Sequence, residues 1–545
     1  MKNKPYPYYE MPGVETIKDL THYGVSRFSS NKLADYRVGK SLRTKTYGEF
    51  DREHKALGSY LFNSGFKNCR IALLGENSYS WFMAFMAFLN GDNVCVPLDK
   101  EMPADDLLNF VNICECKAII YSDSYSFVIE KFKMSKKCVI EKFIPMSALP
   151  KCIYEGEDLL DDGYRDYINA EVKPDSLACV VFTSGTTGKS KGVMLTHKNL
   201  TSDVVSTCEC AKGSDTVVVL PFNHTFSWAS SLFAAFLMGA SMYICPNLKN
   251  VVGDFQKYSP ENFSAVPLVI EMIYKKIWET AKEQGKEKML KNALKVSNAL
   301  LKRGIDMRRI LFKSVIDSLG GNLKTIICGG AALDPVYQKG LYEFGITVIN
   351  GYGITECSPV VTVNRNDYFR LGSCGQALPC NRIKINNPDE DGIGEVYVKG
   401  SNVMTGYFND PEETEKSFDR GWFKTGDYGR LDSDGFLYIT GRKKNLIILA
   451  NGKNVSPEEI EEKLARYDFI KEIVVYEKDN AIRAEIFPDT ENYPDAHRLI
   501  SEAVHDYNIK EPAYKHIASV KYRTQEFPKT TTLKIKRNFV SKESA

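Results

Sequence analysis

The chain has 545 residues, of which 43% are hydrophobic and 26% charged, so it can form several buried cores and more than one domain. Its 71 basic and 69 acidic residues are interspersed, and the net charge of +2 gives no reason to expect a nucleic-acid partner. The 14 cysteines form no CxxC motif, and no Cys/His set for zinc lies near Cys114 and Cys116 or Cys208 and Cys210. Reduced thiols in a cytoplasmic enzyme are therefore expected.

The N-terminal part of the chain alternates between helical and strand patterns. No apolar stretch follows the first lysines, so no signal peptide is predicted. Residues 46–66 have the apolar spacing of a helix that ends at a glycine, and residues 69–77, 93–99 and 116–123 fit buried strands. The alternation predicts an α/β layer with a parallel sheet.

A loop rich in glycine, hydroxyl and lysine side chains follows, TSGTTGKSKG at 183–192. Glycines let the backbone approach a polyphosphate, hydroxyls and N–H groups donate hydrogen bonds, and Lys189 and Lys191 offset anionic charge. The loop is therefore predicted to bind phosphate. Its candidate ligands are Thr183, Ser184, Gly185, Thr186, Thr187, Gly188 and Lys191.

Two other interpretations of this loop stay open. A mobile linker has a similar composition, although linkers are seldom embedded between strand-like runs. Residues 183–190 also match the GxxxxGK[ST] motif of nucleotide-binding loops, except for Thr183 at the first glycine. That motif opens a helix directly, whereas this chain continues into the run GVML and starts a helix only at Thr196. We predict a strand, loop and strand.

The middle of the chain holds an uncharged stretch and then a basic one. Residues 226–246 carry no charge, but their serine, glycine and cysteine content favours a buried helix and strand over a transmembrane span. His224, just past a predicted strand, is by default a hydrogen-bonded histidine. Residues 257–320 are mostly helical and basic, which indicates a solvated helical face or, alternatively, a peripheral membrane surface.

Two glycine turns follow predicted strands, at Gly330–Ala331 and at Gly351–Gly353. Ligands of open α/β sheets lie outside the carboxyl ends of strands, where these turns would be. Tyr352 offers a flat face for adenine, Thr355 a hydroxyl for phosphate and Glu356 an oxygen ligand for Mg²⁺. By itself the motif GYGITE also fits a buried tyrosine and a helix start.

From Gly394 the pattern changes to short strands with Gly and Asp turns. A helix then starts at Ser456, its predicted N-cap, with Pro457 at the first position. Two strands, a further helix and the terminal motif PKTTTLKIKR at 528–537 complete the chain.

The motifs SGTTGKSKG, GYGITE, TGD and PKTTTLKIKR, in this order, resemble those of the adenylate-forming superfamily, which includes acyl-CoA synthetases, luciferases and peptide adenylation domains. Ser190 replaces the usual proline and Leu533 the usual glycine. The helical insert resembles the long-chain branch of the synthetases. The resemblance implies an α/β fold: residues 1–441 as a large domain of layered sheets with a small β-barrel-like part, a hinge at 442–444, and a mobile α+β lid at 445–545.

The resemblance also implies roles for individual residues. Lys534, Glu356 and Thr183 would be catalytic, and Glu356 with Thr187 would hold Mg²⁺. The acyl pocket would include His224 and Gly351, and Lys444 would occupy the hinge. The nucleotide would be bound by the loop 183–191 and by Gly330, Ala331, Tyr352, Gly353, Thr355, Asp427 and Arg442. The pantetheine channel would include Gly452, Lys453 and Asn454.

The implied reaction converts a carboxylic acid, expected to be a medium- or long-chain fatty acid, to an acyl-adenylate with ATP and Mg²⁺ and then to acyl-CoA. Three alternatives remain. The acceptor could be the phosphopantetheine of an acyl carrier protein, the chain could be a kinase or motor-type NTPase that releases ADP, or it could be a non-catalytic acyl- or nucleotide-binding module.

Overall fold

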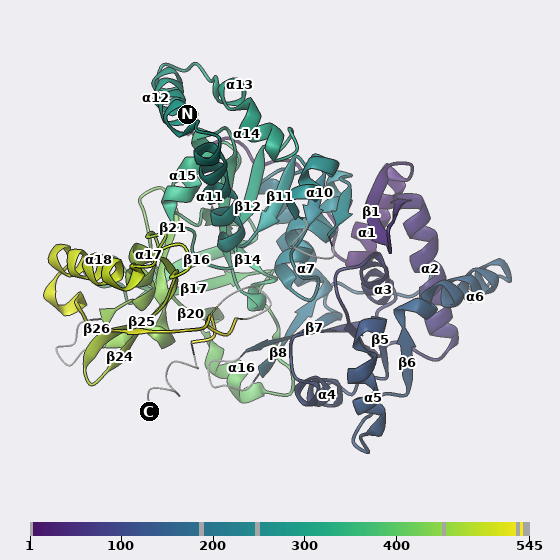
Figure 1. The fold of residues 1–545 in the computed structure, drawn as a ribbon. Coiled ribbons are helices and arrows are strands. Elements are labelled where there is room, and N and C mark those ends of the chain that lie inside the picture. The colour runs from purple at the N-terminus through teal and green to yellow at the C-terminus, as the bar shows by residue number, and fades with distance from the viewer. Residues whose placement is uncertain (1–3, 185–189, 246–250, 449–453, 530–534, 538–545) are drawn as a thin grey trace. The chain divides into compact units, whose positions relative to one another are not determined.

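A computed structural model describes residues 4–184, 190–245, 251–448, 454–529 and 535–537 (Figure 1). Contacts divide the chain into unit 1, Met1–Ile383 with Val398–Phe423, and unit 2, Lys384–Tyr397 with Lys424–Ala545. The predicted α/β class, a large N-terminal part followed by a small C-terminal one, is confirmed. The division at 423/424 precedes the expected hinge at 442–444, which stays a prediction because contacts do not locate a rotation axis.

The larger sheet of unit 1 has nine strands in the order β15-β14-β13-β12-β11-β9-β10-β1-β2. The six strands from β13 to β1 are parallel, and the edge strands are antiparallel to their neighbours. The strands are β1 (Lys32–Val38), β2 (Ser41–Thr46), β9 (Thr216–Val218), β10 (Met242–Ile244), β11 (Asn262–Ala265), β12 (Thr325–Cys328), β13 (Thr347–Gly353), β14 (Val360–Val363) and β15 (Gln376–Ala377).

The second sheet of unit 1 has seven strands in the order β18-β8-β7-β4-β3-β5-β6. The predicted parallel pairing holds from β7 to β6, while β8 and β18 are antiparallel additions at one edge. The strands are β3 (Arg70–Leu74), β4 (Val94–Leu98), β5 (Ala118–Tyr121), β6 (Lys142–Pro145), β7 (Leu177–Ser184), β8 (Ser190–Thr196) and β18 (Gly406–Tyr407).

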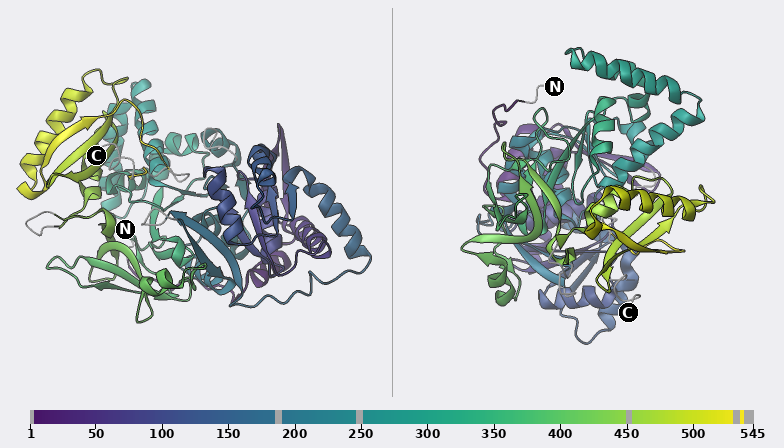
Figure 2. Two further views of the ribbon diagram at one scale, coloured as in Figure 1. Left: turned by 90° about the horizontal axis from the view of Figure 1, so that it is seen from below. Right: turned by 90° about the vertical axis from the view of Figure 1, so that its left-hand side faces the viewer.

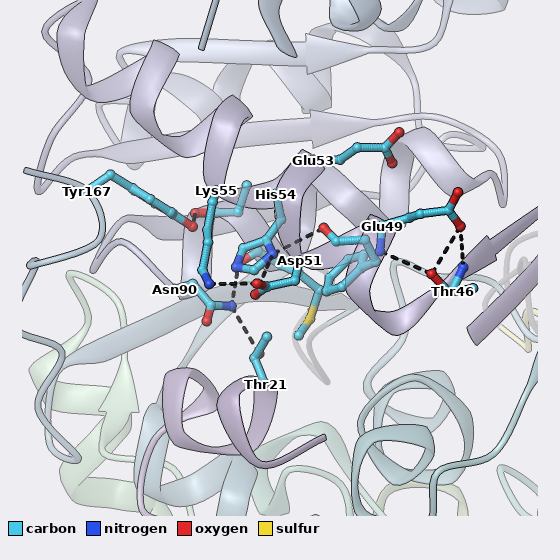
Figure 3. Close-up of polar contacts among 12 residues, drawn as sticks. Thr21, Thr46, Glu49, Asp51, Glu53, His54, Lys55, Asn90 and Tyr167 are labelled. Carbon is cyan, nitrogen blue, oxygen red and sulfur yellow. Dashed lines mark hydrogen bonds and ion pairs between the residues drawn. The ribbon is translucent and has the colours of Figure 1, made fainter. Parts of the chain in front are cut away.

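The helices of unit 1 start at recognisable signals. Figure 3 shows α2, where the Thr46 hydroxyl accepts from the Glu49 amide at 3.2 Å and the Glu49 carboxylate accepts from the Thr46 amide at 2.8 Å. The described helices are α1 (Ile17–Phe28), α2 (Tyr47–Asn63), α3 (Tyr79–Leu89), α4 (Ala104–Ile113), α5 (Ser126–Met134), α6 (Leu149–Asp161), α7 (His197–Cys210), α8 (Thr225–Ser227), α9 (Phe233–Met238), α10 (Val251–Tyr258), α11 (Pro267–Glu283), α12 (Glu287–Lys302), α13 (Arg308–Leu311), α14 (Lys313–Ser318), α15 (Pro335–Glu343) and α16 (Pro411–Ser417).

The uncharged stretch, which the structure describes as far as residue 245, is the predicted buried helix and strand. It forms a π-helix at Trp228–Leu232, then α9 and β10. The aromatic rings of α3 pack against it, with Phe85 4.9 Å from Trp228 and 5.9 Å from Phe233 between ring centroids. Among the described helices, none has the length and apolar character needed to cross a bilayer.

The small β part predicted as barrel-like is a five-stranded sheet in the order β16-β17-β20-β19, with β21 paired to β20. Its strands are β16 (Asn381–Asn386), β17 (Gly394–Gly400), β19 (Phe418–Asp419), β20 (Trp422–Leu431) and β21 (Leu437–Arg442).

The C-terminal elements of unit 2 form a small α+β fold. Its three-stranded sheet pairs β25 with β24 antiparallel and with β26 parallel. Ser456 occupies the predicted N-cap position, but its hydroxyl donates to the Thr440 carbonyl at 2.7 Å instead of capping the helix. The elements are β22 (Ile447–Ile448), β23 (Asn454–Val455), α17 (Pro457–Leu464), β24 (Ile470–Lys478), β25 (Ala481–Pro488), α18 (Ala496–Lys510) and β26 (Ile517–Tyr522).

Candidate functional site

The predicted phosphate loop connects two antiparallel strands, β7 and β8. In their register Thr183 lies opposite Lys191, and Ser184 opposite Ser190. The helix α7 begins only at His197, with Thr196 as its N-cap. The strand, loop and strand prediction is therefore confirmed, and the helix-opening nucleotide loop is wrong for this chain. The loop residues Gly185, Thr186, Thr187 and Gly188 lie outside the described part.

Lys191 and Glu356, far apart in sequence, meet at a single tyrosine of unit 1. The Tyr407 hydroxyl donates to Glu356 Oε1 at 3.0 Å, and the Lys191 ammonium lies 5.0 Å from the centre of the Tyr407 ring. Lys191 also forms an ion pair with Glu413 at the start of α16. Burial, then the Glu356 carboxylate, raises the pKa of Tyr407, which keeps its hydroxyl a neutral donor.

Tyr407 reaches this position because β18 pairs with β8. Tyr407 lies opposite Val193 in that ladder, and the Phe408 amide donates to the Gly192 carbonyl at 2.7 Å. The sequence analysis missed Tyr407 and Glu413. The available signal was the pattern GYFNDPEET, in which an aromatic residue precedes a helix start with acids in its first turn.

The helix α7 holds the turn that carries Glu356. Asp203 Oδ1 accepts from the Val360 amide at 2.8 Å and from Asn402 Nδ2 at 3.0 Å. The Ser358 hydroxyl donates to the Asn402 carbonyl at 2.8 Å. Burial raises the pKa of Asp203 well above its ordinary value, and its second oxygen has no partner among the described residues. The sequence analysis missed this network. The available signal was the carboxylate of Asp203 next to Val204, on the buried face of the helix.

Two glycines of the predicted turns are required by geometry. Gly330 has a φ of +88°, which strains any residue with a Cβ. A Cβ on Gly353 would lie 2.1 Å from the Pro359 carbonyl oxygen. Tyr352 lies opposite Thr362 in the β13–β14 ladder, and Thr355 and Glu356 form one 3-10 turn directly after it. The motif GYGITE thus begins with the last three residues of β13, Gly351 to Gly353, and runs on into this turn, so the strand extends further than predicted. Ala331 is exposed next to Gly330.

His224 lies in a segment where the carboxyl ends of both sheets of unit 1 meet. Asn77 lies just after β3. Its side-chain oxygen accepts a hydrogen bond from the Phe222 amide at 2.9 Å, and its side-chain nitrogen donates one to the Leu220 carbonyl at 2.8 Å. The Phe226 ring closes on Gly329, where a Cβ would come within 3.0 Å of it. His224 therefore lies between the end of β3 and the Gly329–Gly330 turn, and is partly buried at the start of α8.

In unit 2, Asp427 and Arg442 lie opposite each other in the β20–β21 ladder. Arg442 Nε lies 2.9 Å from Asp427 Oδ1, and the Asp427 side chain is only 3% exposed. The two residues predicted to contact the nucleotide are thus brought together. Lys444 is exposed in a short 3-10 turn directly after β21. Gly452, Lys453 and the side chain of Asn454 lie outside the described part.

Lys534 also lies outside the described part, but both of its flanks are attached to the sheet of unit 2. Before it, Lys529 forms an ion pair with Glu472 of β24. After it, Arg537 forms an ion pair with Glu461 of α17, and its second guanidinium nitrogen donates to the Val475 carbonyl at 3.3 Å.

Glu461 is held by the backbone of β24 as well as by Arg537. Its Oε1 accepts from the Val475 amide at 2.6 Å. Burial raises the pKa of Glu461 to about 7, while Arg537 acts in the opposite direction. The flanks also pair with each other, because Lys529 and Ile535 form a β-bridge and the Lys536 amide donates to the Pro528 carbonyl at 2.8 Å.

The described residues fit a magnesium ion held mainly by a polyphosphate. Within the described ranges, no group of three or more His, Cys, Asp or Glu side chains is placed to hold a metal ion. Mg²⁺ bound with nucleotide needs only one or two protein carboxylates. Glu356 meets this need, because the Tyr407 hydroxyl occupies Oε1 and no hydrogen bond from another described residue occupies Oε2. Thr187 is not described.

Comparison with known proteins identifies similar chains. The model of the family "AMP-binding enzyme" matches residues 27–408. A long-chain-fatty-acid–CoA ligase, FadD15 of Mycobacterium bovis, is 28% identical over 428 residues, 74% of this chain and 70% of that protein. Long-chain-fatty-acid–CoA ligase 5 of Rattus norvegicus is 25% identical over 535 residues, 90% and 78% of the two chains. The anthranilate CoA ligase AuaEII with anthranoyl-AMP has a TM-score of 0.78 at 19% identity, over 100% and 99% of the chains.

Proposed function

The chain belongs to the family of AMP-binding enzymes, and from this premise we propose that it is an ATP-dependent acid:thiol ligase that forms acyl-CoA. The observation that carries the proposal is the set Lys191, Tyr407 and Glu356 beside the β7–β8 loop. A cation and a carboxylate thus lie near the strand ends that flank a sequence rich in N–H and hydroxyl donors. Such a site suits a magnesium polyphosphate.

In the first step a carboxylate oxygen of the acid attacks the α-phosphorus of ATP. The bond to the β-phosphate oxygen breaks, and pyrophosphate leaves with its electron pair. Both reactants are anions, so the protein contributes mainly by positioning and by offsetting charge. We assign the β- and γ-phosphates to the loop with Thr183 and Lys191, and the bridge between carboxylate and α-phosphate to Lys534.

Glu356 would hold the Mg²⁺, which when bound offsets the charge of the phosphates. Tyr407 and Asp203 act through Glu356 in this assignment. The hydroxyl of Tyr407 orients the carboxylate, and Asp203 holds the backbone that follows it.

In the second step the thiol of CoA attacks the acyl carbonyl carbon, AMP leaves, and the thiol proton is released. A lysine at the carbonyl would obstruct this attack. We therefore assign to the C-terminal part a rotation about Lys444 that removes Lys534 and brings Gly452 to Asn454 to a pantetheine channel.

The acid we propose is a medium- or long-chain fatty acid. Two long-chain-fatty-acid–CoA ligases are the named relatives, and residues 257–320 supply the long helical insert. An aryl acid is the competing substrate, because the anthranilate CoA ligase shares the fold. The acceptor is assigned as CoA, with a holo-carrier protein as the competing one.

Adenylate formation tests the assignment directly. The purified chain is incubated with ATP, Mg²⁺ and fatty, aryl or amino acids, and the nucleotide product and pyrophosphate are measured. AMP and pyrophosphate are expected with fatty acids. ADP and phosphate would contradict the reaction, and ATP binding without any adenylate would indicate a non-catalytic module. Mass spectrometry of free CoA and of a holo-carrier protein then identifies the acceptor.

The role of Lys534 is tested by Lys534→Ala. Pyrophosphate exchange should fall by at least about 100-fold, because a cation between two anionic reactants is lost. Thioester formation from a preformed acyl-adenylate should persist. Lys536→Ala removes an exposed lysine two residues away and should leave exchange unchanged.

A further inference from the structure

A segment of unit 1 outside the candidate site concentrates positive charge. Residues 286–313 contain nine basic and two acidic residues, a net charge of +7 in a chain whose net charge is +2. Ion pairs with neighbouring acids hold Lys291, Arg308 and Lys313. No ion pair with another described residue engages Lys288, Lys295, Lys302 or Arg303.

The helix α12 within this segment packs on one side only. Ser297 is its single buried residue. The inward side rests on partly buried leucines such as Leu290 and Leu294, and Asn298 donates to Glu343 of α15 at 3.0 Å. In Figure 1 and in the right-hand view of Figure 2, the teal helices around α12 lie at the upper edge of unit 1. The opposite side of α12 faces solvent.

That outer side carries apolar residues beside the lysines. Lys288, Lys295 and Lys302 recur every seven residues, or about two turns, and so form one row. Met289 and Val296 form a second row, about 100° further round the helix, and are 63% and 55% exposed. Large side chains this exposed, next to unpaired lysines, are typical of a helix that lies in a lipid headgroup layer. We call these five residues the α12 surface.

The apolar surface continues beyond α12. Ile305 in the following turn is 50% exposed, and Ile310 of α13 is 67% exposed. Exposed large apolar residues contribute little to binding of a nucleic acid, whose backbone is recognised by charge. They fit an anionic bilayer, which combines negative headgroups with an apolar interior.

We infer that the α12 surface docks this protein on anionic lipid membranes, with the lysines on the headgroups and Met289 and Val296 inserted between them. The contact is peripheral and reversible, because it uses one helix face and unpaired cations. It goes beyond the acid:thiol ligase reaction and does not depend on it. A membrane contact would place the protein where free fatty acids partition.

The test is co-sedimentation of the full chain with vesicles, without ATP or acid, so that its outcome is independent of the ligase activity. The probe is phosphatidylcholine with about one-third phosphatidylserine, compared with phosphatidylcholine alone. We expect binding to the anionic vesicles only, and weaker binding as salt rises from about 0.05 M to about 0.3 M.

Two sets of variants separate the charged and apolar parts. K288E/K295E/K302E should lower the partition coefficient at least about tenfold. M289S/V296S should lower it by about threefold to tenfold at constant charge. The matched control K151E/K173E/K198E changes the net charge equally but is scattered over exposed sites of unit 1, and its loss should be much smaller.

Several outcomes would overturn the inference. They are no binding of the wild-type chain to anionic vesicles, equal binding to neutral ones, or equal losses for the α12 variants and the control. Dimerisation in sedimentation velocity that K288E/K295E/K302E abolishes, without vesicle binding, would make the α12 surface an interface between copies. Binding of an oligonucleotide that M289S/V296S leaves unchanged, again without vesicle binding, would also contradict it.

Discussion

The phosphate loop of unit 1 and the Lys534 segment of unit 2 are held in different ways. The loop is fixed at both ends by the β7–β8 ladder, which has β4 on one side and β18 on the other. The described flanks of Lys534 are held by a β-bridge, by hydrogen bonds from the Lys536 amide and the Arg537 side chain, and by ion pairs of Lys529 and Arg537, chiefly with Glu472 and Glu461.

The difference has a physical consequence. Ladder hydrogen bonds in a central position are formed cooperatively and respond little to salt, whereas partly exposed ion pairs weaken as salt rises. In the proposed reaction the loop binds phosphate and can keep one position, whereas Lys534 acts in the first step and leaves before the second. A segment with few, separable attachments suits that assigned role.

The largest expected effect on adenylation is in unit 1, at Glu356. Glu356→Gln keeps the acceptor for the Tyr407 hydroxyl but removes the charge assigned to Mg²⁺. The rate of pyrophosphate exchange should fall by at least about 100-fold, and the Mg²⁺ concentration that gives half of the maximal rate should rise. Glu412→Gln, an exposed carboxylate of α16, is the control. An unchanged Mg²⁺ dependence would show that Glu356 does not hold the ion.

A smaller effect is expected in the ladder itself. Thr183→Ala or Lys191→Ala should slow adenylation by about 10- to 100-fold, because one phosphate ligand is lost. Thioester formation from preformed adenylate should be spared, since pyrophosphate has already left. The exposed Lys198→Ala is the matched control. Equal losses in both half-reactions would place these residues elsewhere than at the pyrophosphate.

The attachment of the Lys534 segment is tested by Glu461→Gln, which removes the charge that pairs with Arg537. We expect adenylation to fall about tenfold through misplacement of Lys534, while the thioester step is unchanged. High salt should lower wild-type adenylation more than that of the variant, since the variant keeps only the longer Arg537–Glu458 pair, at 3.7 Å, for salt to screen. Glu511→Gln breaks the Lys463–Glu511 pair of the same unit and should change neither step. Equal losses in both steps would indicate a general structural role.

The smallest effect on catalysis is expected in the scaffold, at His54 of α2 (Figure 3). Burial lowers the pKa of His54 from 6.5 to about 4. Above pH 6.5 both folded and unfolded chains hold it neutral, and between pH 6.5 and 4 only the unfolded chain takes the proton. The free energy of unfolding should therefore decrease as the pH is lowered from 6.5 to 4, by at most about 3 kcal/mol.

His54→Gln removes this dependence without changing adenylation. The difference in unfolding free energy between about pH 7.5 and about pH 5 should be smaller in the variant than in the wild type. His22→Gln, at an exposed histidine of α1, should keep the wild-type difference. If His54→Gln keeps the wild-type pH dependence of stability, other groups cause that dependence. His197 is one of them, because burial lowers its pKa to about 4 as well.

Much of the fold was predictable because its signals are local. The helix at 46–66, the strands near 70, 94 and 118, and the strand, loop and strand at 177–196 each follow from periodicity, caps and glycine turns. The same holds for the motif residues Thr183, Lys191 and Glu356, whose chemistry is visible in a few neighbouring letters. The assigned roles of Lys534, Lys444 and the pantetheine channel stay predictions.

The sequence by itself determined which local segments could bind phosphate or hold Mg²⁺, because a glycine turn or a hydroxyl run needs only its own residues. Only the tertiary structure decided that Tyr407 joins Lys191 to Glu356 and that Asp203 holds the turn behind them. These contacts join residues about 50 to 200 positions apart, and their formation depends on the β8–β18 ladder and on the packing of α7. No local pattern encodes a pairing between segments, since each is compatible with many partners until the core closes.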